Sequence, residues 1–446
     1  MIYNKNCINS FNYILLKMNW FLPLIILHDI FSYFFQYIFF TVFFIDKSNI
    51  KLNCIKKITR RLENTNIVYI KIFQTLCCEK DLLNENEKNF LMKYIDNVPY
   101  SDNEIDYLYL EKVCKEYSIT LNSKIPCNSG IMAVVFKGKI ENKNFQDIVI
   151  KLKKIGIDER YEIAYNNLLK LAYYTKFIPF LKNFQIEKLL YDCKENTLLQ
   201  GDFINEVSNL NDIYFKIDNN QEFRVPICFP EITSKYNNII IMEDISGLKI
   251  NDLLNMSQEI KNNFAKLLLK FGICCQLNYG ILNGDFHAGN TFFYLNYDEN
   301  NNPIYQIGII DFGLSFKISK KNQERDFKFL YNMFTLHEFE YCEELIISWL
   351  ESPKMWYELS PHHKNKCMKL LQQNILYCKN MDLDFFYSIA ELFNKNNLHL
   401  NKEFNNLVLS LCCSRAQAAI LTDELVKITK EVMNSLYNIN NILKIE

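Results

Sequence analysis

Three oxygen-bearing side chains stand at the spacing that ATP-dependent phosphoryl transfer requires. Asp285 and Asn290 belong to the segment Gly284–Asn290 (GDFHAGN), and Asp311 opens an Asp-Phe-Gly triplet that ends at Gly313. Phosphoryl transfer needs a carboxylate near the acceptor hydroxyl and oxygen ligands for Mg²⁺. We expect Asp285 to act as the base, and Asn290 and Asp311 to hold the metal. Each motif alone is weak, but their order and their loop–strand–turn–strand spacing together predict this chemistry.

A lysine that ends a short apolar run supplies the expected phosphate contact. Lys151 closes the sequence Ile-Val-Ile-Lys, where a strand would direct it into a phosphate cleft. Such a lysine needs a carboxylate partner on the next helix, and Glu206 is the candidate. Glu243 ends another apolar run, at the place where two lobes would join and adenine would meet backbone groups.

The segment upstream of that lysine takes the place of a nucleotide loop. It contains no Gly-x-Gly-x-x-Gly; residues 126–136 occupy the position, with Gly130 and Ala133 among them. Gly130 would allow the backbone to turn close to phosphate. A classical protein kinase is disfavoured by this loop, by the lack of His-Arg before Asp285, and by the lack of Ala-Pro-Glu downstream.

The hydrophobic pattern predicts the elements that must position these residues. Helices are expected in 51–120, 158–190, 200–216, 251–277 and from 323 onward; strands are expected at 132–136, 147–151, 238–243, 291–294 and 305–310. This order predicts an α+β, bilobal protein-kinase-like fold with an N-terminal helical extension and a largely helical C-lobe. The predicted divisions are 1–50 (apolar, membrane-associated), 51–120 (extension), 121–245 (N-lobe) and 246–446 (C-lobe).

The composition excludes two classes of function. The chain has 446 residues, 50 Lys+Arg against 51 Asp+Glu and a net charge of −1. A nucleic-acid binder that relies on phosphate contacts would need a basic surplus, so we expect no nucleic-acid partner. The 15 cysteines include no Cys-x-x-Cys pair, which disfavours a zinc ribbon and indicates reduced thiols in a reducing compartment.

An apolar N-terminal stretch leaves two interpretations open. Residues 20–45 are dominated by Phe, Ile, Leu and Tyr, but the uninterrupted part, 30–45, is shorter than the ~20 residues of a membrane span. Extending it would bury Asp29 in lipid. A basic run from Lys47 to Arg61 follows, which would place the bulk of the chain on a cytoplasmic or matrix-like side. We expect membrane association; the alternative is a buried helical hairpin that turns at Pro23. Which membrane is involved, and the oligomeric state, stay open.

The motifs together resemble the UbiB/ADCK (aarF-domain) atypical kinase-like family over residues 60–320. Its Lys-x-Gly-Gln motif is similar to Lys71–Gln74 (KIFQ), and its Ala-rich nucleotide loop to residues 129–136. Its strand lysine is similar to Lys151, and its Glu-x-Asp stretch with a following helix Glu to residues 200–206. Its Asp-x-His-x-Gly-Asn loop and Asp-Phe-Gly are similar to residues 285–290 and 311–313.

The resemblance implies more than the spacing does. It places Lys71, Gln74 and Asp202 near the nucleotide and folds the extension over the active site. It implies ATP and Mg²⁺ as cofactors, and ATPase or small-molecule kinase activity rather than protein kinase activity. It also implies a membrane lipid or a lipid-pathway protein as partner, in ubiquinone-type metabolism or membrane lipid homeostasis.

Four positions depart from the family pattern. Phe73 replaces a Gly, Gln200 replaces the first Glu of Glu-x-Asp, Ala288 replaces a Pro, and the nucleotide loop keeps a single Ala, Ala133. The metal-binding set is intact, which favours an active enzyme. The alternative is a catalytically weak or inactive nucleotide-sensing regulator, a pseudokinase that controls a membrane-associated partner.

Overall fold

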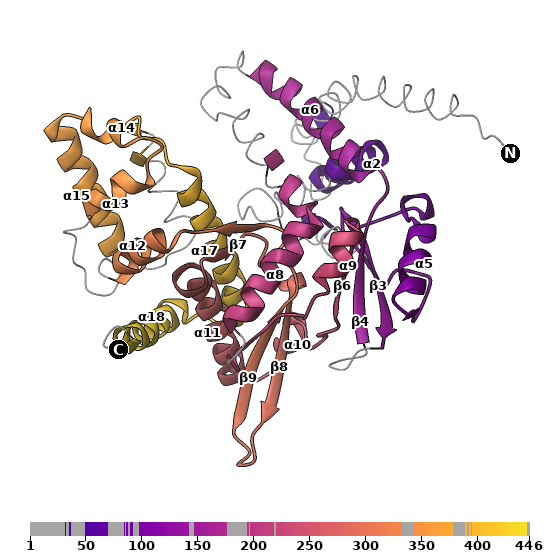
Figure 1. Cartoon of the computed structure of the whole chain (residues 1–446). Helices are drawn as coiled ribbons and strands as arrows, with labels where there is room; N and C mark the ends of the chain where they lie inside the picture. The colour runs from indigo at the N-terminus through magenta and orange to yellow at the C-terminus, as the bar shows by residue number, and fades with distance from the viewer. Residues whose placement is uncertain are drawn as a thin grey trace. The chain divides into compact units, whose positions relative to one another are not determined.

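The structure is a computed structural model of the whole chain (Figure 1). It describes residues 32, 35–36, 50–69, 84, 86–87, 90–91, 98–141, 147–175, 194–195, 197–217, 220–331, 342–377, 389, 392–393 and 395–443. The described chain forms two units. The first comprises residues 1–201 and 236–241, and the second comprises residues 202–235 and 242–446.

The first unit combines a small sheet with helices. Its elements are α2 (Ile50–Thr65), η1 (Ile67–Tyr69), η2 (Asp102–Glu104), α5 (Tyr107–Glu116), β1 (Ile119–Leu121), β2 (Asn128–Ser129), β3 (Ala133–Ile140), β4 (Asp147–Lys153), α6 (Ile157–Thr175) and most of β6 (Ile239–Glu243). The strand order is β1-β3-β4-β6, with β2 also paired to β3. The β3–β4 hairpin is antiparallel and sets Val135 opposite Lys151. Its buried positions alternate along both strands, as a half-buried sheet requires.

One core joins α2 to α6 in this unit. Leu62 of α2 is buried in the same cluster as Tyr161 and Tyr165 of α6, and Ile55 and Ile58 pack against that cluster. Two cations of α2, Lys57 and Arg60, are exposed. The described part of the predicted extension and the predicted N-lobe therefore share a hydrophobic core.

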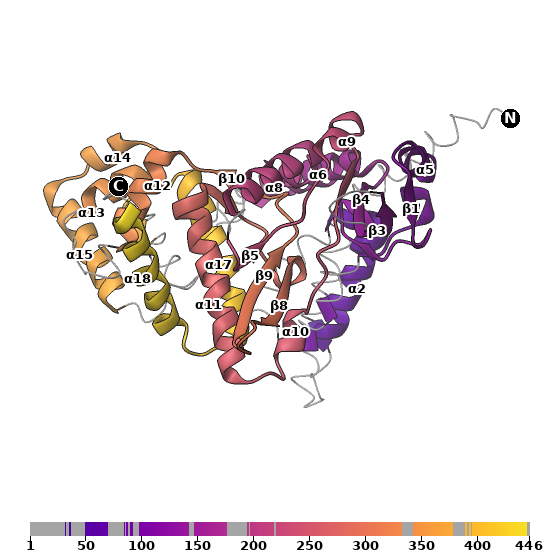
Figure 2. The same ribbon diagram turned by 60° about the horizontal axis from the view of Figure 1, so that its bottom comes forward.

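The second unit is mainly helical, with two small sheets. Its helices are α8 (Phe203–Ile217), α9 (Pro230–Lys235), α10 (Ile250–Leu253), α11 (Gln258–Cys274), the π-helix η4 (Cys275–Tyr279), η5 (Ala288–Asn290), α12 (Lys320–Tyr331), α13 (Cys342–Trp349), α14 (Pro353–Tyr357), α15 (Pro361–Tyr377), α17 (Lys402–Leu421) and α18 (Leu425–Leu443). Its strands are β5 (Phe223–Arg224), β7 (Ile281–Asn283), β8 (Thr291–Tyr297), β9 (Pro303–Ile309) and β10 (Ser315–Lys317). They form one sheet in the order β5-β9-β8 and a pair, β7 with β10. Helix α11 packs along α17 and α18 (Figure 2).

A glycine lies at the turn between the helices α11 and η4 and the strand β7. Gly280 has a φ of +64°, in the left-handed region, and ends the π-helix that follows α11. Residues with a Cβ adopt this conformation at a cost, so a glycine suits the position. The strand β7 starts at the next residue and leads directly into the predicted catalytic loop.

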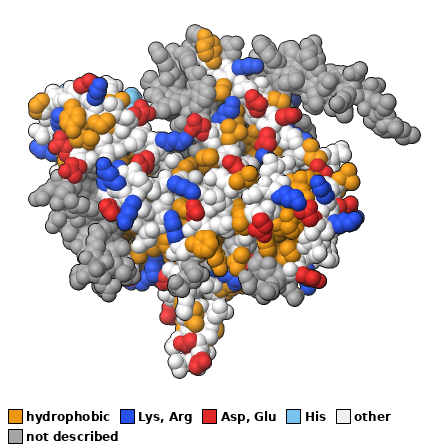
Figure 3. Space-filling view, in the orientation of Figure 1, with side chains coloured by type: hydrophobic (Ala, Val, Ile, Leu, Met, Phe, Trp, Pro, Cys, Tyr) orange, Lys and Arg blue, Asp and Glu red, His pale blue; other side chains and the backbone are white. Residues whose placement is uncertain are grey.

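Most predicted elements are present, with the fold class as expected. The hairpin at β3–β4, the buried strand β6 and the pair β8–β9 occur where the hydrophobic pattern placed them. The strands β1, β2, β5, β7 and β10 were not predicted, because each has only two or three residues. On the face in Figure 3, basic and acidic side chains are interspersed, in keeping with the net charge of −1.

Directly after β4 lies a buried lysine. Lys154 is 2% exposed, and its Nζ lies 3.9 Å from Glu104 Oε2. Glu104 also forms an ion pair with Arg160, so Lys154 shares its carboxylate. Burial is the main cause that lowers the pKa of Lys154 from 10.5 to about 8. Burying this charged ammonium therefore lowers the free energy of unfolding at neutral pH.

We predict that Lys154→Met stabilises the protein at pH 7 by about 1–3 kcal/mol, because it removes that penalty and leaves Glu104 paired with Arg160. The unfolded chain binds more protons between pH 8 and 10.5, so Lys154 makes the free energy of unfolding rise with pH across this window. Urea unfolding from pH 7 to 10 should show a shallower rise in the variant. The exposed Lys139→Met serves as control, and a loss of stability in Lys154→Met at pH 7 would refute the prediction.

Candidate active site

The strand pairing brings the two predicted motifs together. Residues 284–290 connect β7 to β8, and residues 310–314 connect β9 to β10. Because β7 pairs with β10 and β8 pairs with β9, both connections run between the same two strand pairs. The two loops therefore lie side by side. Two backbone hydrogen bonds join them, from Gly284 N to Leu314 O at 2.8 Å and from Ile310 N to Asn290 O at 3.1 Å.

The first loop is held by hydrogen bonds among its own residues. Nδ1 of His287 accepts from Gly289 N at 3.0 Å, and Asn290 Nδ2 donates to Asp285 O at 3.2 Å. Nε2 of the same ring lies 3.1 Å from Asn290 Nδ2 and 3.8 Å from Asp285 Oδ1, so the imidazole lies beside both side chains. The loop therefore orients the predicted base from within.

A buried asparagine bridges the two loops. Asn283, 1% exposed, accepts from Asp285 N through Oδ1 at 2.9 Å and donates through Nδ2 to Asp311 O at 2.9 Å. In the second loop, Gly313 N donates to Asp311 Oδ1 at 2.9 Å. One side chain thus ties the predicted base to the predicted metal ligand, while the Gly313 amide orients the carboxylate of that ligand.

Two phenylalanines anchor these loops to the helical core. Phe286 and Phe312 are 1% and 0% exposed. Phe271 of α11 contacts both rings, with centroid distances of 5.2 Å to Phe286 and 6.4 Å to Phe312. Each motif therefore inserts its aromatic residue into the core beside the polar residue that would carry the chemistry.

The donor set fits a metal shared with a nucleotide. Asn290 uses Nδ2 within the loop, which directs its amide oxygen away from Asp285 O, and Asp311 offers a carboxylate. Mg²⁺ in nucleotide sites is held by one or two protein oxygens together with phosphate oxygens and water. Within the described residues, no group of three or more His, Cys, Asp or Glu side chains could hold a metal ion. The residues present therefore suit Mg²⁺ bound to phosphates better than a metal held by protein alone.

The predicted phosphate-binding residues of the first unit lie on one hairpin. Lys151 is half-buried on β4, Ala133 begins β3, and Gly130 N donates to Ala133 O at 2.8 Å in the turn before it. Lys153 ties the neighbouring Gln200-Gly201 segment to β4, because its Nζ donates to Gly201 O at 3.0 Å. The hairpin thus brings Lys151, Gly130 and Ala133 together.

The helix that carries the predicted partner of Lys151 belongs to the second unit. Asp202 is exposed and accepts from Asn205 N at 3.1 Å at the start of α8, where it caps the helix. Glu206 lies in the first turn and is fully buried. One turn later, Asn209 donates to Phe312 O at 3.3 Å and fixes α8 to the Asp-Phe-Gly turn. The ion pair of Lys151 with Glu206 stays a prediction.

The segment 243–249 at the end of β6, called the connector below, has hydrogen-bond partners within the second unit. The Glu243 carboxylate pairs with Arg224 and accepts from Ile227 N, and Glu243 N donates to Ile227 O at 2.9 Å. The contact of this backbone with adenine stays a prediction. Tyr294 of β8 donates to Ile245 O. Burial raises the pKa of this phenol to about 12, so it remains a donor at neutral pH.

A lysine that was not predicted contacts the loop Gly284–Asn290. Lys249 Nζ donates to Gly289 O at 2.9 Å and lies 3.7 Å from the ring centroid of Phe292. It therefore links the connector to the residue before Asn290. No sequence motif marks this lysine, because its contact depends on the pairing of Leu248 with Phe293.

Two predictions fall on residues outside the described part of the chain. Lys71 and Gln74 of the KIFQ motif are among them, as is nearly all of the apolar stretch 20–45. No helix among the described residues is long and apolar enough to cross a membrane.

Comparison with known proteins now decides the family. The model of the ABC1 atypical kinase-like domain matches residues 96–344, more than half of the chain. The chain belongs to the ABC1 atypical kinase-like family. This confirms the UbiB/ADCK resemblance seen in the motifs, and with it the kinase-like fold class.

Individual members of the ABC1 family are distant. The chain is 23% identical over 286 residues to the Arabidopsis thaliana protein named "ACTIVITY OF BC1 COMPLEX KINASE 1, chloroplastic", covering 60% of this chain and 39% of the relative. It is 24% identical over 268 residues to a "Probable protein kinase UbiB" of Shewanella baltica, covering 57% and 46%. The chain thus spans less than half the length of these relatives. A solved structure of Rv3197 with erythromycin from Mycobacterium tuberculosis aligns at 13% identity over 85% of this chain and all of that one, with a TM-score of 0.38.

We predict that Asn283→Ala destabilises the protein by about 2–3 kcal/mol, because it removes a buried side chain and leaves the part-buried Asp285 amide and Asp311 carbonyl without this partner. Urea unfolding measures the loss. The exposed Asn296→Ala on the β8–β9 hairpin is the control and should change stability by less than about 0.5 kcal/mol. Equal stabilities for Asn283→Ala and the control would show that the bridge contributes nothing.

Proposed function

We propose that this ABC1-family chain is an Mg-ATP-dependent phosphotransferase or ATPase that acts at a membrane, in lipid or ubiquinone-type metabolism. The observation that carries the chemical part is the pair of adjacent loops bridged by Asn283, which sets Asp285 next to the Asp311 turn. The names of the UbiB relatives support the metabolic part.

Each residue has a defined role in this proposal. Asp285 accepts the proton of the acceptor hydroxyl or of water, and the His287 ring lies beside its carboxylate. The oxygens of Asn290 and Asp311 hold Mg²⁺, which when bound neutralises charge on the phosphates. Lys151, held by Glu206, binds phosphate oxygens, and the connector backbone near Glu243 receives adenine. Lys71, Gln74, Gly130, Ala133 and Asp202 complete the nucleotide site as the family resemblance implies.

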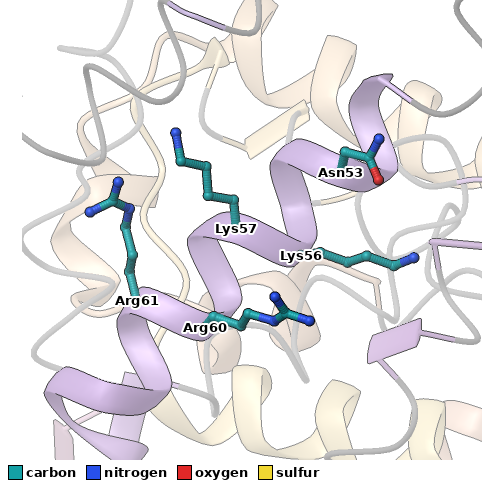
Figure 4. A pocket seen from close by; sticks show the side chains of 5 residues that line it. All are labelled: Asn53, Lys56, Lys57, Arg60 and Arg61. Carbon is teal, nitrogen blue, oxygen red and sulfur yellow. The ribbon is translucent and has the colours of Figure 1, made fainter.

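The basic charge of helix α2 supports the proposal that the chain acts at a membrane. Helix α2 has five basic residues and one acidic residue in a chain of net charge −1. Figure 4 shows Asn53, Lys56, Lys57, Arg60 and Arg61 fanning out from this helix around an open hollow. The apolar stretch 20–45 precedes it in the sequence. An apolar segment followed by a cationic helix suits the surface of an anionic bilayer, and we propose that this region attaches the chain to one.

We predict that Mg-ATP raises the melting temperature of the full chain, because a ligand of the native state stabilises it, by about 2.7 kcal/mol at 100 times Kd. Lys151→Ala and Asp311→Asn should abolish the shift. Lys139→Ala, at an exposed position of β3, and Asp298→Asn, in the β8–β9 turn, are the matched controls. Differential scanning fluorimetry with and without Mg²⁺ measures it.

The same proteins separate an enzyme from a regulator. Asp285→Asn should keep the Mg-ATP shift and lose ATP hydrolysis, which would support the enzyme. A wild-type chain that binds Mg-ATP without turnover, with or without lipid vesicles, would support the nucleotide-sensing regulator that Phe73 and Gln200 suggest. No shift at millimolar Mg-ATP would refute both.

We predict that Lys57→Gln combined with Arg60→Gln weakens binding to vesicles that contain phosphatidylserine by about 30-fold, because each surface cation contributes about 1 kcal/mol. Vesicle flotation of the full chain measures the binding. The pair Lys115→Gln and Lys139→Gln, also exposed in the first unit, is the control. Equal binding by both pairs, or binding that is unaffected by 0.5 M salt, would contradict an electrostatic role for α2.

A further inference from the structure

A helix beyond the family match supports the catalytic loop. The ABC1 model ends at residue 344, whereas α17 begins at Lys402. Asn401 caps α17 by accepting from Phe404 N at 2.9 Å. The helix packs along α11 (Figure 2), and Gly272 of α11 makes room for Ser414, because a Cβ there would collide with the serine. These contacts fix α17 against the helix that also carries Phe271.

Two side chains of α17 reach the backbone on either side of Asp285. Gln417 Nε2 donates to Phe286 O at 2.8 Å, and Cys413 Sγ lies 3.7 Å from Gly284 O. The two residues are one turn apart and so lie on the same helix face. The carbonyl before Asp285 and the carbonyl after it are therefore both bound by one rigid helix.

The burial of Gln417 indicates what this residue is for. It is 3% exposed, and its Oε1 has no hydrogen-bond partner among the described residues. A buried amide with an unpaired oxygen is costly, and an apolar residue of the same length would avoid that cost. The benefit that offsets it is the bond to Phe286 O.

We propose that Gln417 is a positioning residue that holds Asp285 in place by fixing the carbonyl of Phe286, with Cys413 assisting at Gly284. The inference rests on the proposed function for the role of Asp285 as base. It extends the active site to a part of the chain that the family model does not match.

The test is Gln417→Met in the full chain, since methionine keeps the length and removes both the donor and the unpaired oxygen. Ser410→Ala is the matched control: Ser410 is 1% exposed and lies two turns earlier on α17. Hydrogen exchange of the peptide 281–291 reports loop order without any need for turnover. We expect exchange there to be about 5- to 10-fold faster in Gln417→Met, with the α11 peptide 258–274 unchanged, because one net hydrogen bond is lost locally.

Activity provides the second readout. If the wild-type chain hydrolyses ATP, Gln417→Met should lower kcat by about 10-fold and leave the KM for Mg-ATP within about 2-fold, because it displaces the base and not the nucleotide site. Ser410→Ala should keep wild-type kcat. Should Gln417→Met fail to fold, Cys413→Ala at a half-buried position takes its place, with a smaller change in the same direction.

The outcomes separate this inference from the proposed function. Unchanged exchange in the loop, or equal acceleration in the loop and α11, would overturn the positioning role. Faster exchange confined to the loop supports it even in a chain without turnover. The proposed function itself stands or falls on Mg-ATP binding by the wild type.

Discussion

The candidate site depends on one aromatic contact, that of Phe271 with Phe286 and Phe312. Burying these rings removes a large apolar area from water and thereby determines where each loop must run. Asp285 immediately precedes Phe286, and Asp311 immediately precedes Phe312. Anchoring each ring therefore places the neighbouring carboxylate at the margin of the core. Asp285 and Asp311, 26 residues apart in the sequence, thus lie in paired loops that both contact the same side chain of α11.

The hydrogen bonds around these rings complete the placement. Burying a ring also buries the backbone beside it, and its amides and carbonyls must find partners. Asn283 serves Asp285 N and Asp311 O, and Asn209 serves Phe312 O. These bonds fix the backbone beside the predicted base and beside the predicted metal ligand. Side chains outside the two motifs thus make the motifs rigid.

The sequence marks the two candidate motifs more clearly than the residues that support them. The motifs at 284–290 and 311–313 are recognisable because their residue types and order are those expected for phosphoryl transfer. The β3–β4 hairpin and β8–β9 are recognisable because five or more residues follow the strand pattern. By contrast, β7 and β10 have three residues each, which is too few for the alternation of apolar and polar residues in a strand to be visible. Asn283 and Lys249 were not predicted for another reason. Their hydrogen bonds depend on residues that are distant in the sequence and close in the fold, and a local sequence pattern does not contain this information.

The family match and the second unit end at different residues. The match to the family model ends at residue 344. The support of a loop requires only a donor at the right place, and any well-packed helix can offer one. Here α17 does so through Gln417, 73 residues beyond the match, and the second unit extends to the end of the chain. The matched domain and the second unit therefore have different bounds, because a buried carbonyl in the matched part takes its partner from a helix outside the match.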